Sequence, residues 1–210
     1  MKKIIIIGGG AAGMIAAAMA AEQAKCAVSL FEKNAYLGAK VLISGGGRCN
    51  LTTGIFDVKE LLKNYPRGAK FLMTAMFRFP PEKVMEWFKG HGVALKTEKD
   101  LRVFPVSDNS KDIVSALEKD LRQKGVEIFC NMSVTQIAKN GEQFTVTSKD
   151  GRTFVSDAII LTTGGSAYRH TGSTGDGYAF AEALGHTITA LGPSLNSFVI
   201  AEKWAGALAG

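Results

Sequence analysis

The chain has 210 residues, of which 46% are hydrophobic and 21% charged, and its formal net charge is +6 at pH 7. This balance is typical of a soluble globular protein with a sizeable core. No apolar run approaches the roughly 20 residues of a membrane-spanning helix, which excludes a membrane protein of that kind. Three widely separated cysteines without metal-ligand spacing predict neither a disulfide framework nor a metal site, and they favour a reducing compartment.

The first 32 residues have the pattern of a dinucleotide-binding βαβ unit. The β-branched run Lys2–Ile7 predicts a strand buried on both faces, and Cys26–Phe31 predicts a second one. Between them, a Gly-Gly-Gly-Ala-Ala-Gly turn leads into a predicted helix over Met14–Ala24, which is rich in alanine and methionine. The order of strand, glycine turn, helix, strand and acid predicts a site for FAD or NAD.

Each glycine of this turn has a separate physical task. Gly8 permits a tight turn, Gly10 lets a pyrophosphate approach the backbone, and Gly13 lets the helix lie close to the sheet. The pyrophosphate then meets free N–H groups at the positive end of the helix dipole. Glu32 follows the last glycine by 19 residues and is predicted to bond a ribose hydroxyl. Because a carboxylate repels a 2′-phosphate, FAD or NAD is favoured over NADP.

A secretory signal peptide is the competing interpretation of the N-terminus, because two lysines precede an apolar stretch with Ala-x-Ala triplets. Three consecutive glycines inside that stretch fit a signal peptide poorly, and a cleaved segment has no use for Glu32. We therefore expect a retained N-terminus and a cytoplasmic protein.

The segment from Asn34 to Asn50 is predicted to be a glycine-rich loop laid against a ligand. Its centre, Ser44-Gly45-Gly46-Gly47-Arg48-Cys49-Asn50, combines close backbone approach with the permanent charge of Arg48. The alternative is a flexible surface linker. For Cys49, a redox-active thiol beside the cofactor competes with a small packing residue, and no C-x-x-C partner supports the former.

The middle of the chain predicts helices between Val58 and Gly90, with Pro81 opening the last of them. Their methionine and aromatic positions are interpreted as core rather than as cofactor contacts. Further predicted elements are short strands over Val93–Lys96 and Leu101–Pro105 and a helix over Lys111–Lys124, capped by Asn109 or Ser110.

A basic, aromatic surface for nucleic acid is one interpretation of this region, and the solvated faces of amphipathic helices are the alternative. The basic residues are not contiguous and form no known motif, so no nucleic-acid partner is expected. The residues concerned are Lys59, Lys63, Tyr65, Arg67, Lys70, Phe71, Phe77, Arg78 and Phe79.

The second half predicts a strand, a three-stranded meander and a return to the buried sheet. The strands are expected over Val126–Phe129, Ser133–Ala138, Gln143–Ser148, Thr153–Ser156 and Ala158–Leu161, with Asp-Gly in the tight hairpin. Thr162-Thr163-Gly164-Gly165 then predicts another backbone approach at the carboxyl edge of the sheet. Thr171-Gly172-Ser173-Thr174-Gly175-Asp176-Gly177 enters a helix over Tyr178–Leu184 and predicts an anion or flavin-edge site.

At these residues the sequence resembles the BaiN/RdsA-type (YhiN-like) bacterial NAD(P)/FAD-dependent oxidoreductases, relatives of the glutathione-reductase-type FAD-binding proteins. The resemblance rests on the opening glycines with Glu32-Lys33, on Leu42–Asn50, on Arg102–Ser107 and on Thr171–Tyr178. It implies an α/β, Rossmann-like FAD-binding domain in which a parallel sheet with helices carries a three-stranded β-meander.

The resemblance also implies site residues, all of them for the cofactor. They are Gly8, Gly10, Ala11, Ala12, Gly13, Glu32, Lys33, Lys40, Ser44, Gly45, Gly46, Arg48, Cys49, Val134, Thr163, Gly164, Gly165, Thr174, Gly175 and Asp176. Val134 would meet the adenine, and Thr174-Gly175-Asp176 would approach the flavin. No catalytic residue is assigned. His170 is interpreted as a solvated loop histidine rather than a proton donor.

Relatives of this family are about twice as long by domain-size reasoning. We therefore expect residues 1–190 to form the N-terminal portion of the FAD-binding domain, and residues 191–210 to begin a truncated, inserted substrate domain. Arg169, where the family pattern has proline, is a departure beside the flavin.

Three functions follow as hypotheses. The first is an FAD-dependent oxidoreductase that moves hydride between NAD(P)H, flavin and a small organic substrate, with enone reduction as one option. The second is an NAD-binding dehydrogenase without flavin, and the third is an FAD-binding module without complete activity. The sequence does not set the substrate or the oligomeric state.

Overall fold

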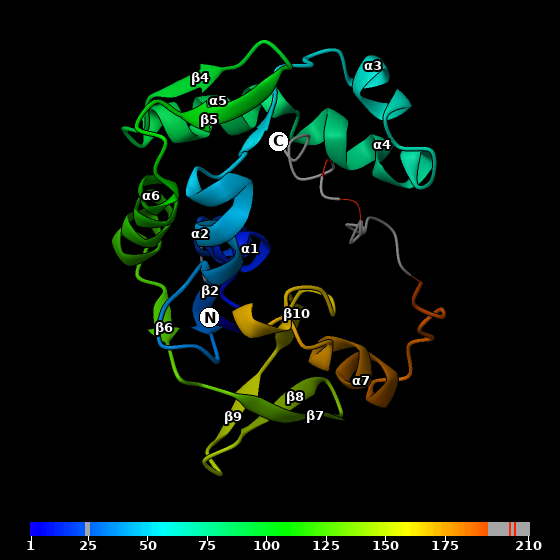
Figure 1. The fold of residues 1–210 in the computed structure, drawn as a ribbon. Coiled ribbons are helices and arrows are strands. Elements are labelled where there is room, and N and C mark those ends of the chain that lie inside the picture. The colour runs from blue at the N-terminus through cyan, green and yellow to red at the C-terminus, as the bar shows by residue number, and fades with distance from the viewer. Residues whose placement is uncertain (24–25, 193–201, 203, 205–210) are drawn as a thin grey trace.

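The computed structural model describes residues 1–23, 26–192, 202 and 204 (Figure 1). At its centre lies a four-stranded sheet in the order β10-β1-β2-β6, in which all neighbouring strands are parallel. The strands are β1 (Lys2–Ile7), β2 (Cys26–Phe31), β6 (Glu127–Phe129) and β10 (Ala158–Leu161). The predicted strands and the Rossmann-like fold class are thereby confirmed.

The register brings the carboxyl ends of three strands together. Ile7 pairs with both Phe31 and Leu161, so the residues that follow, Gly8, Glu32 and Thr162, meet at one edge of the sheet. In open α/β sheets this edge is where ligands bind.

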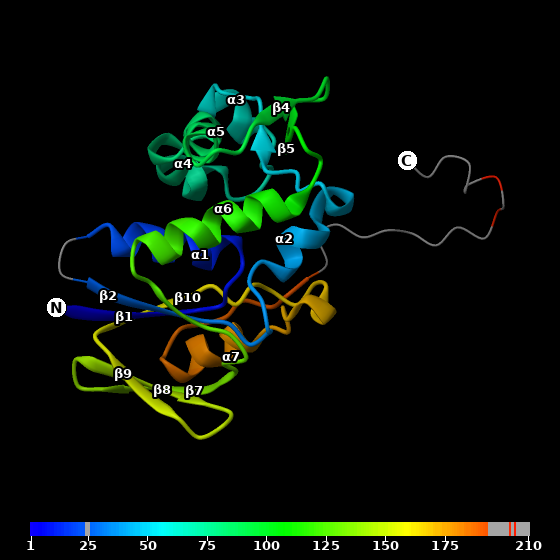
Figure 2. The ribbon, with the colours of Figure 1, turned by 90° about the vertical axis from the view of Figure 1, so that its left-hand side faces the viewer.

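The two faces of the sheet are buried in different layers because side chains alternate along a strand. Ile6 and Leu30 face a core shared with α1 (Ala11–Ala21) and α6 (Ser110–Gln123). Ile7 and Phe31 face a second core shared with the meander and α7 (Asp176–Ala183). Figure 2 shows α1 and α6 on one side of the sheet and the meander on the other.

The meander is confirmed as the antiparallel sheet β7-β8-β9, formed by Val134–Asn140, Gln143–Ser148 and Thr153–Ser156. In its β8–β9 turn, Asp150 accepts hydrogen bonds from Arg152 and from Ser148 Oγ. These bonds hold the pKa of Asp150 well below its usual range, so the carboxylate stays charged and fixes the turn.

A third group of elements lies at the opposite end of the molecule from the meander (Figure 1). Its sheet β3-β5-β4 consists of Thr52–Thr53, Arg102–Pro105 and Leu95–Thr97. Its helices are α3 (Val58–Lys63), α4 (Ala69–Arg78) and α5 (Pro81–Gly90), and the expected start of α5 at Pro81 is confirmed.

Several predicted boundaries shift. Helix α1 begins at Ala11 rather than Met14, and its expected last residue, 24, lies outside the described part. Helix α6 begins at Ser110, and the Asn109 side chain caps it by accepting from Lys111 N–H at 3.0 Å. Among the described residues, no helix is long and apolar enough to cross a membrane.

The expectation of a loop throughout residues 34–50 is wrong in its second half. Helix α2 (Ala39–Ile43) and a 3₁₀ turn (Ser44–Gly47) occupy it. Gly38 takes a left-handed conformation, with φ of 70°, and starts α2 at a sharp turn that glycine density alone does not reveal. The expected domain boundary after residue 190 stays a prediction, because most of residues 191–210 lie outside the described part.

Candidate functional site

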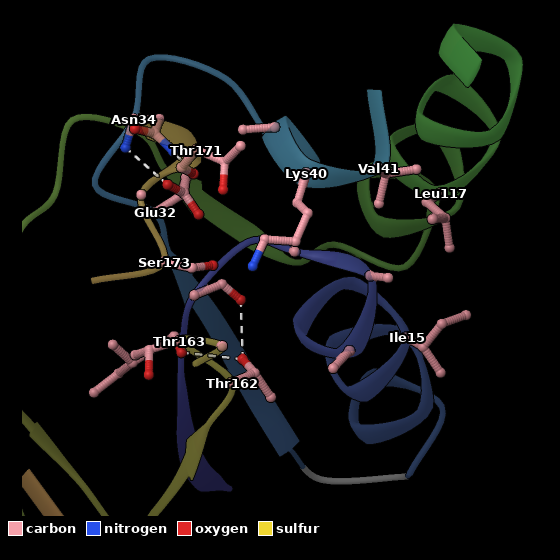
Figure 3. Close-up of a pocket in the computed structure, with 18 of the residues that line it drawn as sticks. Ile15, Glu32, Asn34, Lys40, Val41, Leu117, Thr162, Thr163, Thr171 and Ser173 are labelled. Atoms are coloured by element: carbon pink, nitrogen blue, oxygen red, sulfur yellow. Dashed lines mark hydrogen bonds between the residues drawn. The ribbon is translucent and has the colours of Figure 1, made fainter. Parts of the chain in front are cut away.

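A cavity of about 510 Å³ opens at the carboxyl edge of the central sheet (Figure 3). It is lined by the ends of β1 and β2, the first turn of α1, α2, the start of the meander, and residues 162–164 and 171–173. Its volume lies within the roughly 300–1,000 Å³ of small-molecule and cofactor sites. The topology therefore places one cavity against the predicted glycine turn.

The three glycines of the predicted fingerprint have different surroundings. A Cβ on Gly13 would lie 1.8 Å from the carbonyl oxygen of Gly8, and one on Gly8 would lie 2.5 Å from the Thr162 oxygen. A Cβ on Gly10, by contrast, would have no atom of the described residues within 4 Å, and Gly10 lines the cavity. Packing therefore requires Gly8 and Gly13, whereas the space beside Gly10 is open to a ligand.

The N-terminus of α1 carries no internal cap. Gly10 at the N-cap supplies no side chain, the first turn contains no acidic residue, and Ala11 and Ala12 both line the cavity. Within the described residues, the N–H groups of Ala11 and Ala12 find no backbone acceptor. Free N–H groups at the positive end of a helix dipole are suited to a phosphate group.

Glu32 is buried at the end of β2, where its carboxylate lines the cavity. One oxygen accepts from Gly9 N–H at 2.7 Å and the other from Asn34 N–H at 2.8 Å. Each carboxylate oxygen has a further acceptor site, so a ribose hydroxyl can still be bound. Glu32 thus also fixes the glycine turn, a role that its spacing alone did not predict.

Lys33 links β2 to the start of α7. Its Nζ donates to Thr174 Oγ1 at 2.6 Å and to Asp176 Oδ2 at 2.8 Å, across more than 140 positions of sequence. The Lys33 ammonium holds the pKa of Asp176 below its ordinary value. Lys33 and Asp176 line the cavity, whereas Thr174 and Gly175 do not.

Replacing Lys33 with methionine is expected to reduce the acid sensitivity of folding. The pKa of Asp176 is depressed in the folded state, so the Lys33–Asp176 pair stabilises the fold at pH values above the unfolded pKa of about 3.9. This stabilisation is lost as the pH falls through the lower pKa of the folded state. Asp176 is 44% exposed, so the effect is below about 1 kcal/mol. Urea unfolding at neutral pH and below pH ~4 measures it.

The matched control is Lys63→Met, which removes the more exposed Lys63–Glu60 pair on α3. This control should leave the acid-dependent loss of unfolding free energy near that of the parent chain. Equal pH dependence in the Lys33 variant and the parent chain would show that the Lys33–Asp176 pair does not stabilise the fold.

The glycine-rich segment before β3 divides between the cavity and the surface. Ser44, Cys49 and Asn50 line the cavity, whereas Gly45 and Gly46 are exposed outside it. Of the ligand contacts that the sequence predicts in this segment, only those at its two ends line the cavity in the described structure.

Arg48 points to the β4–β5 hairpin instead of lining the cavity. Its Nη1 donates to Glu98 at 2.7 Å and to Asp108 at 3.2 Å, and its guanidinium lies 3.9 Å from the centre of the Phe104 ring. These interactions fasten the segment to the hairpin and to the turn before α6, which gives Arg48 a structural role that the motif did not reveal.

Cys49 is buried, lines the cavity and has a left-handed backbone with φ of 62°. Burial raises the pKa of its thiol, which lowers the thiolate fraction at neutral pH. The structure favours the packing interpretation of Cys49 over the redox one.

The segment after β10 closes the cavity from the other side. Thr162 Oγ1 donates towards the carbonyls of Ile7 and Gly8, and Thr163 and Gly164 line the cavity while Gly165 does not. Lys40 donates to the carbonyl of Ala167 at 3.0 Å. Figure 3 shows Lys40 extending across the cavity opposite Thr162 and Thr163.

Two further predictions concern the outer ends of the site. Val134, in β7, lines the cavity beside Ser133 and Met132, where the adenine was expected. Tyr168 and His170 are exposed and do not line it, in agreement with a solvated loop histidine.

The cavity also has an apolar half that sequence reasoning assigned to the core. We call it the apolar arm; it is formed by Ile15, Val41, Leu51, Phe79, Val84, Trp87, Phe88, Ile113 and Leu117. Helical periodicity predicts which faces are apolar but not whether they meet a neighbour or a void. Further polar lining residues lie in segments that were predicted to approach a ligand but were not themselves named as cofactor contacts. They are Asn34, Asn50, Thr162, Thr171 and Ser173.

Comparison with known families decides the affiliation. The model of the HI0933-like protein Rossmann domain matches residues 2–196. The chain belongs to the HI0933-like family. The resemblance inferred from Leu42–Asn50 and the other motifs is thereby confirmed.

Two curated relatives of this HI0933-like chain are each 33% identical to it. The 3-dehydro-bile acid delta(4,6)-reductase of Clostridium scindens aligns over 196 residues, 93% of this chain and 47% of the relative. The ribosomal RNA dihydrouridine synthase of Escherichia coli aligns over 181 residues, 86% of this chain and 44% of the relative. The chain thus spans about half the length of these relatives.

Among solved structures, the 3-ketosteroid-delta4-(5alpha)-dehydrogenase of Rhodococcus jostii RHA1 resembles the chain with a TM-score of 0.60. The identity is 16%, and the match covers 80% of this chain and 47% of that one. This likeness shows that the HI0933-like chain and the Rhodococcus enzyme share a fold.

Proposed function

We propose that the chain is the FAD-binding part of an oxidoreductase. The observation that carries this proposal is the open space beside Gly10, which faces the uncapped N-terminus of α1 in the same cavity as Glu32. Backbone donors suited to a pyrophosphate and a carboxylate suited to a ribose hydroxyl are thereby combined in one volume.

FAD is favoured over a nicotinamide cofactor alone because the cavity extends beyond the βαβ unit. An NAD-binding dehydrogenase would use the glycine turn and Glu32. It would leave unexplained why the same cavity continues to Val134 at one end and to Ser44 and Cys49 at the other. FAD uses more of this lining than NAD, because its three-ring isoalloxazine is larger than a nicotinamide ring and is joined to the pyrophosphate through a ribityl chain.

Each group of residues would have a defined task towards FAD. The first turn of α1 would bind the pyrophosphate, Glu32 would accept from the adenosine ribose, and Val134 would contact the adenine. Lys33 would hold Thr174 and Asp176 against the flavin side through the bonds it donates. Bound FAD supplies hydride chemistry, which amino-acid side chains lack.

We propose NAD(P)H as the electron donor and a conjugated carbon–carbon double bond as the group reduced. Support for a reduction comes from the names of the two relatives at 33% identity, a delta(4,6)-reductase and a dihydrouridine synthase, since dihydrouridine is uridine with one carbon–carbon double bond reduced. The E. coli relative acts on ribosomal RNA by name, so RNA is the competitor of a small organic substrate in the test.

The test is anaerobic addition of NADH or NADPH to the chain loaded with FAD, followed by a simple enone, 2-cyclohexenone, or by unmodified ribosomal RNA. We expect NADH or NADPH to bleach the visible flavin absorbance and the enone to restore it. If the absorbance returned only with RNA, the proposal of a small-molecule substrate would be overturned. Bound FAD that no nicotinamide bleaches would support a module without complete activity.

A further inference from the structure

The cavity continues past the N-terminus of α1 into the apolar arm, which no part of the dinucleotide site requires. Figure 3 shows Ile15, Val41 and Leu117 on one side of Lys40, with Glu32 and Asn34 on the other. The arm is bounded by α1, α2, α5 and α6, whose facing side chains are hydrocarbon or aromatic. One continuous volume therefore has a polar half and an apolar half.

Lys40, at the boundary between the arm and the polar half, donates to the carbonyl of Ala167, and four further charged or titratable residues near the arm are paired outside it. His91 follows Trp87 by one helical turn, and its Nε2 lies 3.2 Å from Asp120 Oδ1. Lys124 Nζ forms ion pairs with Asp120 Oδ2 at 2.7 Å and with Glu22 Oε1 at 2.6 Å. None of these four charged or titratable residues lines the cavity. Because the arm offers no partner for a buried charge, a charged ligand group would be unfavourable there.

Aromatic contacts fix one wall of the arm. The Trp87 ring stacks on His91 with centroids 3.8 Å apart, and it meets Phe88 edge-on at 4.7 Å. His91 Nδ1 donates to the Trp87 carbonyl oxygen at 2.7 Å, and its Nε2 lies 3.2 Å from Asp120 Oδ1, which holds the stack in place. A flat, rigid wall is suited to a ring system rather than to a flexible chain.

The polar edge of a flavin ring does not match the arm. Its carbonyl and ring nitrogen atoms require hydrogen-bond partners, and the polar side chains of the cavity, such as Asn34, Thr163 and Ser173, lie in the other half. A ligand without such groups loses nothing on entering the arm.

We propose that the apolar arm binds a neutral, ring-containing, hydrocarbon-rich compound beside the dinucleotide site. That this compound is the reducible substrate rests on the proposed function, whereas its binding does not. Apolar walls of this kind supply affinity through the area removed from water.

The test is equilibrium dialysis of the neutral compound N-phenyl-1-naphthylamine against the chain, with and without saturating FAD. One molecule per chain is expected, bound also when FAD is present. Val41→Glu places a charge in the arm and should weaken binding by at least about tenfold. Ile43→Glu, on the same helix α2 but exposed and outside the cavity, should leave binding unchanged.

Circular dichroism establishes that each variant folds, and Val41→Phe, which fills the arm without adding charge, provides a second blocked form. Equal binding by the parent, Val41→Glu and Val41→Phe chains would overturn the proposal, as would displacement of the naphthylamine by FAD. A chain that binds naphthylamine in this pattern but no FAD would retain the arm and refute the proposed function.

Discussion

Replacing Gly10 with valine is expected to abolish tight FAD binding while leaving the fold intact. Gly10 has φ of −77° and ψ of −173°, an extended conformation that valine adopts, and its Cβ would touch nothing in the described chain. The added side chain would instead occupy the volume beside the α1 N-terminus, where the pyrophosphate is proposed to lie. Affinity should fall by at least about tenfold, or about 1.4 kcal/mol.

Two other glycines provide matched controls. Gly90, at the end of α5, also has open space around its Cβ but does not line the cavity, so Gly90→Val should retain FAD. Gly13→Val should fail to fold normally, because its Cβ would lie 1.8 Å from the Gly8 oxygen. Thermal unfolding and FAD titration separate these outcomes, and undiminished FAD affinity in Gly10→Val would place the pyrophosphate elsewhere.

Glu32→Ala is expected to lower both stability and FAD affinity. The substitution leaves the Gly9 and Asn34 N–H groups without their acceptors at a buried position, which costs about 1–3 kcal/mol per group. It also removes the proposed charge-assisted bond to the adenosine ribose, worth about 1.5–3 kcal/mol of affinity. Urea unfolding and FAD titration measure the two effects separately.

Glu127→Ala is the control for this prediction. Glu127 is an exposed carboxylate of β6 that accepts from Ser29 Oγ at 3.1 Å, so its loss should change little. A Glu32→Ala chain that loses stability but binds FAD like the parent would restrict Glu32 to fixing the glycine turn.

The βαβ unit could be predicted from sequence because its determinants are local. The glycine spacing, the apolar strands and Glu32 all lie within 32 residues, and each signal concerns the conformation or packing of its own segment. The meander could be predicted for the same reason, since Asp150-Gly151 specifies a tight turn between two strands whose hydrophobic and polar residues alternate.

Contacts between distant segments were beyond sequence reasoning. Nothing local indicates that Lys33 would bond Asp176, or that Arg48 would bond Glu98 and Asp108 rather than face the cavity. These pairings follow from the strand order and from where the fold places α7 and the β4–β5 hairpin, which belongs to a separate sheet.

The apolar arm illustrates a different limit. Ile113 and Leu117 lie at helical spacing in the predicted helix over Lys111–Lys124, and both are buried in α6. The same spacing results whether that face meets only a neighbouring helix or also borders a cavity. Only the relative placement of α1, α5 and α6 distinguishes the two cases.

The central claim is that this chain holds FAD in the cavity beside Gly10. Its most direct test is titration of the purified chain with FAD, followed by flavin fluorescence and, in parallel, titration with NADH alone. We predict saturable binding of one FAD per chain, lost in Gly10→Val and retained in Gly90→Val. A chain that binds NADH but no FAD would contradict the account.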